Sequence, residues 1–353
     1  MQVEQQVAIL HGAGYAGGEL IRLLIHHPIF SLKAVTSRSF AGQPVWASHP
    51  SLRGQTELRF STNDDLQYQN FAAIFIAAEH GQGAAIVSKL LDEGFAGKIV
   101  DLSADFRLKQ SDMYDQWYGF KHPAPALLDQ FVYGMAEASS SYPESTRFIA
   151  NPGCFATGIS LAVWPAVQHL DNPDVNITAL TGASGSGATP KPTTHYPTRE
   201  GNVRAYKVLR HQHLAEVNQL LNNQCHIAFT PVSGPWVRGI WGTARFKLPA
   251  QVTADDVAAW YNDAYENRPL IRLWPNNLPE LRYVVQTPFC DIGWIVEGDD
   301  LIVGFAIDNL LKGAASQAVQ NLNLICNLPE TTGLLPHSQE QLVSNGYPGN
   351  HTN

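Results

Sequence analysis

The chain has 353 residues, of which 44% are hydrophobic and 15% charged, and its formal net charge is −8. These values are typical of a folded protein long enough for two domains, and they exclude a largely disordered chain. The acidic charge argues against a nucleic-acid-binding surface, and no apolar run approaches the roughly 18 residues that cross a bilayer. No signal-peptide pattern is visible and the four cysteines lie far apart, so we expect a cytoplasmic protein.

The first predicted elements are a strand, a glycine turn and a helix. Residues 6–10 form a short apolar run typical of a buried parallel strand, and the segment GAGYAGG follows from Gly12. Because a helical pattern comes directly after it, the order matches the dinucleotide-binding motif G-x-G-x-x-G. Gly12 would make the tight turn, Gly14 would let the backbone approach a pyrophosphate, and Gly17 would allow close packing of helix on strand. A purely structural glycine turn is the alternative.

The second predicted strand, residues 32–36, ends without an acidic residue. An NAD site usually places Asp or Glu there to bind the ribose hydroxyls. Here Ser37 and Arg38 follow instead, and a hydroxyl and a guanidinium suit a 2′-phosphate. The sequence therefore favours NADP over NAD, unless Arg38 is an ordinary surface arginine.

Strands and helices continue to alternate, with strands expected at 73–78 and 98–102 and a helix at 83–91. Ligands of such parallel sheets bind at the carboxyl ends of the strands. Ser103 is therefore expected near the cofactor, and Arg107 near an anionic group of the substrate. A plain ion pair of Arg107 with Asp105 is the alternative. We expect this Rossmann-type domain to cover residues 1–150.

Cys154 follows an Asn-Pro-Gly turn and precedes an apolar helical pattern. The first N–H groups of a helix are unpaired, and the helix dipole adds partial positive charge there. Both effects stabilise a thiolate, so we expect a lowered pKa and a nucleophilic role for Cys154. The alternative is an inert buried cysteine.

Polar groups recur further along the chain. The glycine-rich segment 181–188, with Ser184 inside it, offers N–H and hydroxyl donors that can surround a phosphate or a carboxylate. His211 and His213 precede the next helix. Their spacing and the lack of a Cys or Asp cluster argue against a metal site, so we expect one of them to act as an acid/base. A histidine that is merely hydrogen-bonded remains the alternative.

The second half also contains strand-like runs, at 225–230, 239–248, 283–286, 291–297 and 300–307. They predict a mostly antiparallel sheet, with one helix at 253–267. A last helix, 309–327, should pack back on the nucleotide domain, and the tail 336–353 is polar. The expected fold is therefore α/β: a Rossmann-type NADP-binding domain followed by an α+β catalytic domain at 151–308.

A nicotinamide site combined with an activated cysteine and a histidine points to redox chemistry on an acyl group. A thioester accepts a hydride better than a carboxylate or an amide does. Covalent catalysis would divide the reaction into thioester formation and reduction, which converts an acyl phosphate to an aldehyde.

Seven stretches together make the chain similar to the N-acetyl-gamma-glutamyl-phosphate reductases, whose fold resembles that of aspartate-semialdehyde dehydrogenase. They are GAGYAGGEL at 12–20, DLSADFRL at 101–108, YGMAE at 133–137, NPGCFATG at 151–158, GASGSG at 182–187, HQHLAEV at 211–217 and DNLLKGAASQAVQN at 308–321. The resemblance implies NADPH-dependent reduction of N-acetyl-L-glutamyl 5-phosphate to the 5-semialdehyde in arginine biosynthesis. It also implies a homodimer or homotetramer.

The resemblance further implies roles for individual residues. Cys154 would be the nucleophile and His211 the acid/base, with His213 as the other candidate. Glu216 would orient that histidine or hold substrate. The implied cofactor residues are Gly12, Gly14, Tyr15, Ala16, Gly17 and Asn309, in addition to Ser37, Arg38 and Ser103, which their positions at strand ends predict. The implied substrate residues are Arg107, Asn151, Ser184, His213 and Glu216.

Two features depart from the commonest pattern of that family. The family often has H-R-H-x-P-E where this chain has HQHLAE from His211, and the insert 189–207 is unusual. The insert resembles relatives whose glutamyl or aminoadipyl phosphate carries another amino-blocking group, such as succinyl or a small carrier protein. The blocking group and a carrier-protein partner therefore stay open. A dehydrogenase of aspartyl phosphate and a non-enzymatic NADP sensor are the other readings.

Overall fold

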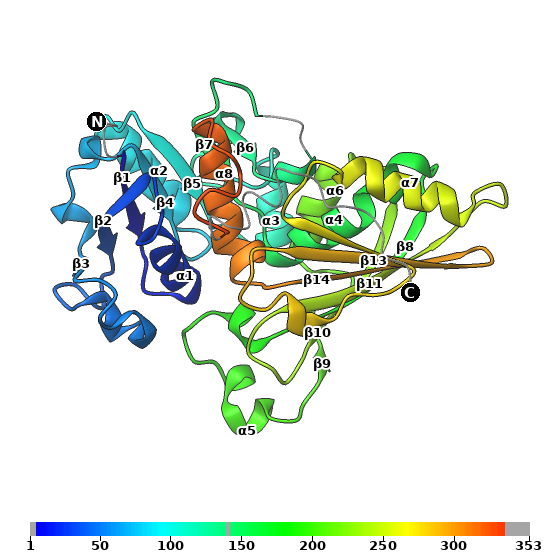
Figure 1. Cartoon of the computed structure of the whole chain (residues 1–353). Coiled ribbons are helices and arrows are strands. Elements are labelled where there is room, and N and C mark those ends of the chain that lie inside the picture. Colours follow the sequence, from blue (N-terminus) through cyan, green and yellow to red (C-terminus); the bar gives the residue numbers. More distant parts are fainter. Residues whose placement is uncertain (1–4, 139–141, 336–353) are drawn as a thin grey trace.

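The computed structural model describes residues 5–138 and 142–335, which form two sheets of seven strands each (Figure 1). The first sheet comes from the N-terminal part of the chain and the second from the part after Cys154. None of the described helices has the length and apolar character needed to cross a membrane. The polar tail predicted for 336–353 lies outside the described residues.

The first sheet is entirely parallel, with the strand order β3-β2-β1-β4-β5-β7-β6. Its strands are β1 (Gln5–Leu10), β2 (Phe30–Thr36), β3 (Phe60–Ser61), β4 (Ala73–Ile76), β5 (Lys98–Asp101), β6 (Phe131–Tyr133) and β7 (Phe148–Ala150). The chain builds outward from β1 to β3 and then returns to place β4 on the other side of β1. The crevice at such a reversal is where open α/β sheets bind their ligands.

Helices cover both faces of this sheet, because alternate residues of each strand point to opposite sides. Val7 and Ile9 of β1 belong to a core shared with α1 (Tyr15–Leu24) and α8 (Ser316–Ile325). Ala8 and Leu10 belong to a core shared with α2 (Gly83–Asp92) and α3 (Asp112–Tyr118). The C-terminal helix α8 thus packs beside α1 on the first sheet, as Figure 1 shows.

The second sheet is mixed, with the order β12-β13-β14-β11-β8-β10-β9. Its strands are β8 (Asp174–Thr181), β9 (Arg204–Ala205), β10 (His226–Ser233), β11 (Ile240–Lys247), β12 (Ile271–Pro275), β13 (Cys290–Glu297) and β14 (Asp300–Ile307). The pairs β8–β10 and β12–β13 are parallel and the other four are antiparallel. The prediction of an α/β fold with a mostly antiparallel second sheet is confirmed.

Three helices pack on the second sheet: α4 (Cys154–His169), α6 (His213–Leu220) and α7 (Ala254–Tyr265). Helix α4 is central, since it contacts α6, α7, β11 and β14. Most of its residues are buried, so the cysteine at its first position is held by a well-packed helix.

One predicted strand was wrong, one strand was missed, and one predicted helix begins in a different form. Residues 283–286 are not a strand: a short helical turn, Leu281–Tyr283, lies there, and Gln286 has a φ of 65°, which a strand does not permit. The edge strand β12 was missed instead. The helix predicted from residue 309 starts with a π-helical turn, Leu311–Ala315, before α8.

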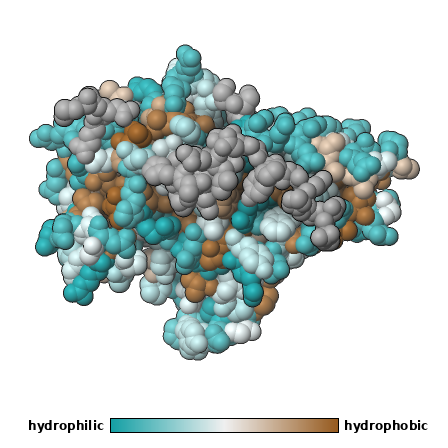
Figure 2. Space-filling model, viewed as in Figure 1, coloured by the Kyte–Doolittle hydropathy of each residue, from teal (hydrophilic) through white to brown (hydrophobic). Residues whose placement is uncertain are grey.

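The insert between β8 and α6 forms a lobe, residues 188–210. Its short helix α5 (Tyr196–Arg199) protrudes from the second sheet, while its strand β9 pairs with β10 at the edge of that sheet (Figure 1). Figure 2 shows the protruding part of this lobe in pale teal and white, so its surface is weakly hydrophilic.

Candidate active site

One pocket collects residues from the glycine turn, the β4–α2 loop, the start of α4, the lobe and the segment after β14. Twelve of the predicted site residues line it: Gly14, Tyr15, Ala16, Gly17, Ser37, Arg38, Arg107, Cys154, Ser184, His211, His213 and Asn309. The other four, Gly12, Ser103, Asn151 and Glu216, are buried behind the wall of the pocket.

The glycine turn between β1 and α1 is shaped for close approach of a ligand. A Cβ on Gly12 would lie 2.4 Å from Val35 Cγ1, and one on Gly17 would lie 2.4 Å from the Gly12 carbonyl oxygen. Gly14 faces open space and is the N-cap of α1, where no side chain accepts from the first N–H groups. Glycine is therefore required for packing at two positions, and α1 begins with free donors that fit a pyrophosphate.

The end of β2 carries the residues predicted for the 2′-phosphate. Ser37 is buried and donates its backbone N–H to Ser61, whereas Arg38 is exposed and lines the pocket. Glu79, after β4, is the one acidic residue among the described residues that line the pocket. The donors at β2 thus fit the phosphate of NADP better than the ribose hydroxyls of NAD.

Cys154 is the first residue of α4, as the sequence predicts, and Gly153 is the N-cap. Its side chain packs closely under the π-helical turn, because a Cβ on Gly313 would lie 2.7 Å from Cys154 Cβ. Burial raises the pKa of the Cys154 thiol to about 11, although Arg107 and the Phe155 N–H act in the opposite direction. The expected lowering of this pKa is wrong for the free protein, because desolvation outweighs the helix start.

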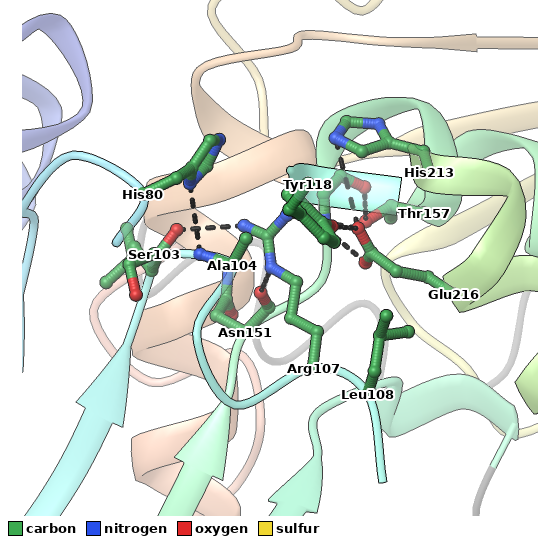
Figure 3. A network of polar contacts seen from close by, with 12 residues as sticks. His80, Ser103, Ala104, Arg107, Leu108, Tyr118, Asn151, Thr157, His213 and Glu216 are labelled. Carbon is green, nitrogen blue, oxygen red and sulfur yellow. Dashed lines mark hydrogen bonds and ion pairs between the residues drawn. The ribbon is translucent and has the colours of Figure 1, made fainter. Parts of the chain in front are cut away.

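Glu216 is the centre of a buried polar network beneath this turn (Figure 3). Its Oε2 accepts from Gly153 N–H at 2.9 Å and from Tyr133 Oη at 2.8 Å. Its Oε1 accepts from Arg107 Nη1 at 3.1 Å and from Tyr118 Oη at 3.2 Å. Burial raises the pKa of both tyrosines well above the ordinary value, and the charge of Glu216 adds to this, so both remain donors.

Arg107 completes the network from the other side. Its Nε donates to the Asn151 carbonyl at 2.8 Å and its Nη2 to the Leu102 carbonyl at 2.8 Å. Asn151 in turn receives a hydrogen bond from Asn321 and donates to the Ala314 carbonyl. Arg107 is therefore occupied by Glu216 and by carbonyl groups, and the residues before Cys154 are fixed at both Asn151 and Gly153.

Ser103, predicted near the cofactor, does not reach the pocket. Its hydroxyl donates to Asp101 and accepts from Asp105 N–H, while Asp105 accepts from the Gly81 and Ala84 N–H groups. Ser103 thus stabilises the start of α2 indirectly, through Asp105.

The two predicted histidines have different hydrogen bonds. The backbone N–H of His213 donates to His211 Nδ1 at 3.2 Å. Because Nδ1 accepts this bond, neutral His211 carries its proton on Nε2. His213 Nε2 lies 3.9 Å from Glu216 Oε1, and within the described ranges His213 Nδ1 has no partner. Glu216 therefore approaches His213, not His211 as expected. Burial lowers the pKa of His211 to about 2 and that of His213 well below its ordinary value, so both are neutral near pH 7.

Ser184 and Asn309 come together although they are 125 residues apart. Asn309 Nδ2 donates to Ser184 Oγ at 3.0 Å and Asn309 Oδ1 accepts from Gly239 N–H at 2.6 Å. The glycine-rich loop after β8 is thereby fixed against the segment after β14, and both face the pocket.

Sequence reasoning missed several pocket residues. His80 follows β4, and its Nδ1 accepts from Ala104 N–H at 3.0 Å. Burial, with the nearby Arg107 charge, lowers its pKa to about 4. The position of His80 shortly after a predicted strand was the signal that could have identified it as a pocket residue. The cations Lys191, Arg204 and Lys207 of the lobe also line the pocket, and their positions depend on how the insert folds. No group of three or more His, Cys, Asp or Glu side chains in the described ranges is arranged to hold a metal.

Comparison with known proteins agrees with this architecture. Residues 6–144 match the family model described as "Semialdehyde dehydrogenase, NAD binding domain", and residues 154–309 match "Semialdehyde dehydrogenase, dimerisation domain". An N-acetyl-gamma-glutamyl-phosphate reductase of Methanocella arvoryzae is 41% identical over 336 residues, which cover 93% of this chain and 97% of the relative. A putative [LysW]-L-2-aminoadipate 6-phosphate reductase of Thermomicrobium roseum is 40% identical, with 93% and 97% covered.

Solved structures show the same fold at low identity. Aspartate semialdehyde dehydrogenase II from Vibrio cholerae superposes with a TM-score of 0.70 at 17% identity, covering 91% of this chain and 98% of its own. The enzyme from Candida albicans, solved with NADP, gives a TM-score of 0.64 at 12% identity, covering 92% and 99%.

Proposed function

The chain belongs to the N-acetyl-gamma-glutamyl-phosphate reductases of the semialdehyde dehydrogenase family, and on this premise we propose that it reduces N-acetyl-L-glutamyl 5-phosphate to the 5-semialdehyde. The observation that carries the proposal is Cys154 at the start of α4, in one pocket with two histidines and a free helix N-terminus. The step would belong to arginine biosynthesis.

The proposed reaction starts with attack of Cys154 Sγ on the acyl carbon. The C–S bond forms, the C–O bond to phosphate breaks, and inorganic phosphate leaves. NADPH supplies the hydride that reduces the thioester. The resulting hemithioacetal collapses to the aldehyde, and the sulfur of Cys154 is released.

A base must take the proton of Cys154, because the raised pKa keeps the thiol protonated near pH 7. Two properties of His213 support this role. Its Nδ1 is buried and has no hydrogen-bond partner among the described residues, and burial lowers the pKa of the imidazole, so that His213 is neutral. His211 carries its proton on Nε2 and is suited to donate to the oxygen of the hemithioacetal. We propose that the two histidines divide the acid/base role in this way, with His211 as the acid.

For the cofactor we propose NADP(H). The start of α1 from Gly14 to Gly17 would hold the pyrophosphate, and Ser37 and Arg38 would hold the 2′-phosphate. Asn309, fixed to Ser184, would lie near the nicotinamide. Ser103 lies behind the wall, so we propose only an indirect part for it.

We also propose domain limits near residues 150 and 308, because the chain changes sheets there and α8 returns to the first sheet. The family model for the dimerisation domain supports a homodimer or homotetramer, and a cytoplasmic location fits the small-molecule substrate.

A second substrate is favoured by the lobe and by the relative from Thermomicrobium roseum. In that case the same chemistry would act on a glutamyl or aminoadipyl phosphate whose amino group carries a succinyl group or a carrier protein. The carrier protein would then be a partner of the lobe.

The reverse reaction tests the proposal. Enzyme, NADP⁺, phosphate and N-acetylglutamate semialdehyde are mixed, and NADPH absorbance is followed. We expect phosphate-dependent NADPH formation, reduced about 10⁴-fold or more in Cys154→Ser. If the acetyl compound is inactive, the succinyl and carrier-linked semialdehydes are tried next. Inactivity with all of them, despite tight binding of NADPH, would contradict the reductase and favour a nucleotide sensor.

A further inference from the structure

Arg238, in the segment between β10 and β11, links two carboxylates from different parts of the fold. Its Nε and Nη2 donate to the two carboxylate oxygens of Asp308, each at 3.0 Å, and its Nη1 donates to Glu19 Oε1 at 2.6 Å. Asp308 directly follows β14 of the second sheet, whereas Glu19 belongs to α1, which packs on the first sheet. The Arg238 side chain is 18% exposed, so solvent screens these ion pairs less than pairs at the open surface.

The Asp308 carboxylate is fully buried and fixes the backbone that follows β14. Its Oδ1 accepts from the N–H groups of both residues 310 and 311, and its Oδ2 accepts from the Gln286 N–H. Residue 311 begins the π-helical turn that packs over Cys154. Arg238 supplies the counter-charge that keeps this buried carboxylate, and with it the start of the turn, in place.

The residue after Arg238 holds the residue after Asp308. The Gly239 N–H donates to Asn309 Oδ1 at 2.6 Å, and Asn309 is the side chain that we place near the nicotinamide. Two consecutive residues of one segment thus position two consecutive residues of another. The Arg238–Gly239 segment therefore fixes both the start of the π-helical turn and Asn309.

Glu19 connects this arrangement to the cofactor site. It lies in α1, the helix whose start would hold the pyrophosphate. Figure 1 shows α1 beside the segment that leads from β14 into α8, and the two are in contact. Among the described residues, Arg238 shares no hydrogen bond with the Glu216 network that holds the turn before Cys154. The Arg238 link is therefore separate from the network that fixes the nucleophile.

We propose that Arg238 is a positioning residue for hydride transfer, which acts through Glu19 on the cofactor helix and through Asp308 on the turn over Cys154. The inference rests on the proposed function, in which thioester formation needs no cofactor and reduction of the thioester needs NADPH. Hydride transfer requires the two reacting carbons to be held close together, and a displacement of about 1 Å can slow such a step about 100-fold. Loss of the link should therefore slow the reduction and leave the acylation unchanged.

The test measures the two steps separately in single turnovers. Acylation is followed as phosphate release when enzyme is mixed with N-acetylglutamyl 5-phosphate in the absence of NADPH. Hydride transfer is followed as loss of NADPH absorbance when the acylated enzyme is mixed with increasing NADPH, or with NADPH deuterated at the nicotinamide C4. In Glu19→Ala we expect hydride transfer at saturating NADPH to slow about 10- to 100-fold and to show a deuterium isotope effect, while the acylation rate stays within about twofold of wild type.

Three further variants identify the cause. Glu19→Gln keeps an oxygen that can accept from Arg238, so it should restore part of the rate. Arg22→Gln is the matched control, because Arg22 also pairs with Glu19 but lies on α1 itself, and it should behave as wild type. Arg238→Lys keeps a positive charge beside Asp308 without the paired donors, so it should slow hydride transfer. Combining it with Glu19→Ala should add little, because both changes break the same link.

The possible failures can be told apart. A wild-type enzyme that releases no phosphate and forms no aldehyde refutes the proposed function together with this inference. An unchanged rate of hydride transfer in Glu19→Ala at saturating NADPH overturns the positioning role alone, and a weaker Kd for NADPH beside it would show that the link serves only cofactor affinity. Equal losses in both steps would show that the link only stabilises the fold, and would overturn the positioning role as well.

Discussion

Two buried arginines have opposite surroundings: Arg107, which holds the turn before Cys154, and Arg199, in the lobe at residues 188–210. Arg107 donates to the Glu216 carboxylate and to two carbonyls, and Glu216 accepts four hydrogen bonds. Arg199 has one hydroxyl and one carbonyl, and its Nε is unpaired within the described residues. Among the described residues, Arg107 has a carboxylate partner and Arg199 has none.

This difference separates two tasks. A nucleophile must be held in place before substrate arrives, and a saturated, buried network does that by fixing the backbone at Asn151 and Gly153. A recognition site gains selectivity when its polar groups are left without partners by the wrong ligand. We therefore propose that the turn serves the chemistry and that the lobe contributes to substrate binding.

The largest expected effect is on the reactivity of the Cys154 thiol, and it tests whether the turn stabilises the thiolate. Burial raises the pKa of Cys154 to about 11, so the thiolate fraction should increase about tenfold per pH unit below that value. Alkylation of Cys154 by iodoacetamide in the free enzyme should accordingly accelerate about 10³-fold between pH 7 and pH 10. The site of modification is read by peptide mass. A rate that levels off near pH 8 would mean that the turn does stabilise the thiolate.

Glu216→Gln removes the carboxylate that holds the turn before Cys154 in place. The neutral amide leaves Arg107 buried without its counter-charge and cannot accept from all four donors. We expect a loss of about 3–5 kcal/mol in the free energy of unfolding, measured by urea denaturation. We also expect kcat to fall about 100-fold while NADPH affinity stays unchanged. Glu297→Gln, at an exposed position, is the matched control. Unchanged kcat in Glu216→Gln would remove the positioning role.

The smallest effect is expected in the lobe. Arg204 and Lys207 are exposed, so solvent screens them and each contributes modestly. Replacing either by Gln should raise the KM of the semialdehyde about 3- to 10-fold at low ionic strength, with kcat unchanged and the difference diminishing as salt is added. Steady-state kinetics at two salt concentrations measures this. A fall in kcat with constant KM would place these residues in the chemistry and remove the contrast with the turn.

Much of the fold could be predicted because the local signals agree with it. The apolar run before Gly12, the glycine turn and the helix after Cys154 all specify elements by short-range pattern. Residues 283–286 misled the prediction because an apolar pair suggested a strand, whereas the positive φ of Gln286 is set by the surrounding turn.

The sequence indicated many residues that line the pocket, but it did not indicate which side chains hydrogen-bond to one another. Cys154, the histidines and the glycines stand in recognisable motifs. The four donors to Glu216 come from residues between 63 and 109 positions away, so only the folded chain brings them together. The pKa of Cys154 was predicted in the wrong direction, because a sequence shows the helix start but not the degree of burial.

The most direct test of the central claim is to observe the thioester. Wild-type enzyme is incubated with N-acetylglutamyl 5-phosphate in the absence of NADPH, quenched in acid and weighed by intact-protein mass spectrometry. We expect a mass increase equal to the acyl group, located on Cys154, removed by hydroxylamine and absent in Cys154→Ser. An unmodified Cys154 in an enzyme that still forms aldehyde when NADPH is supplied would contradict it.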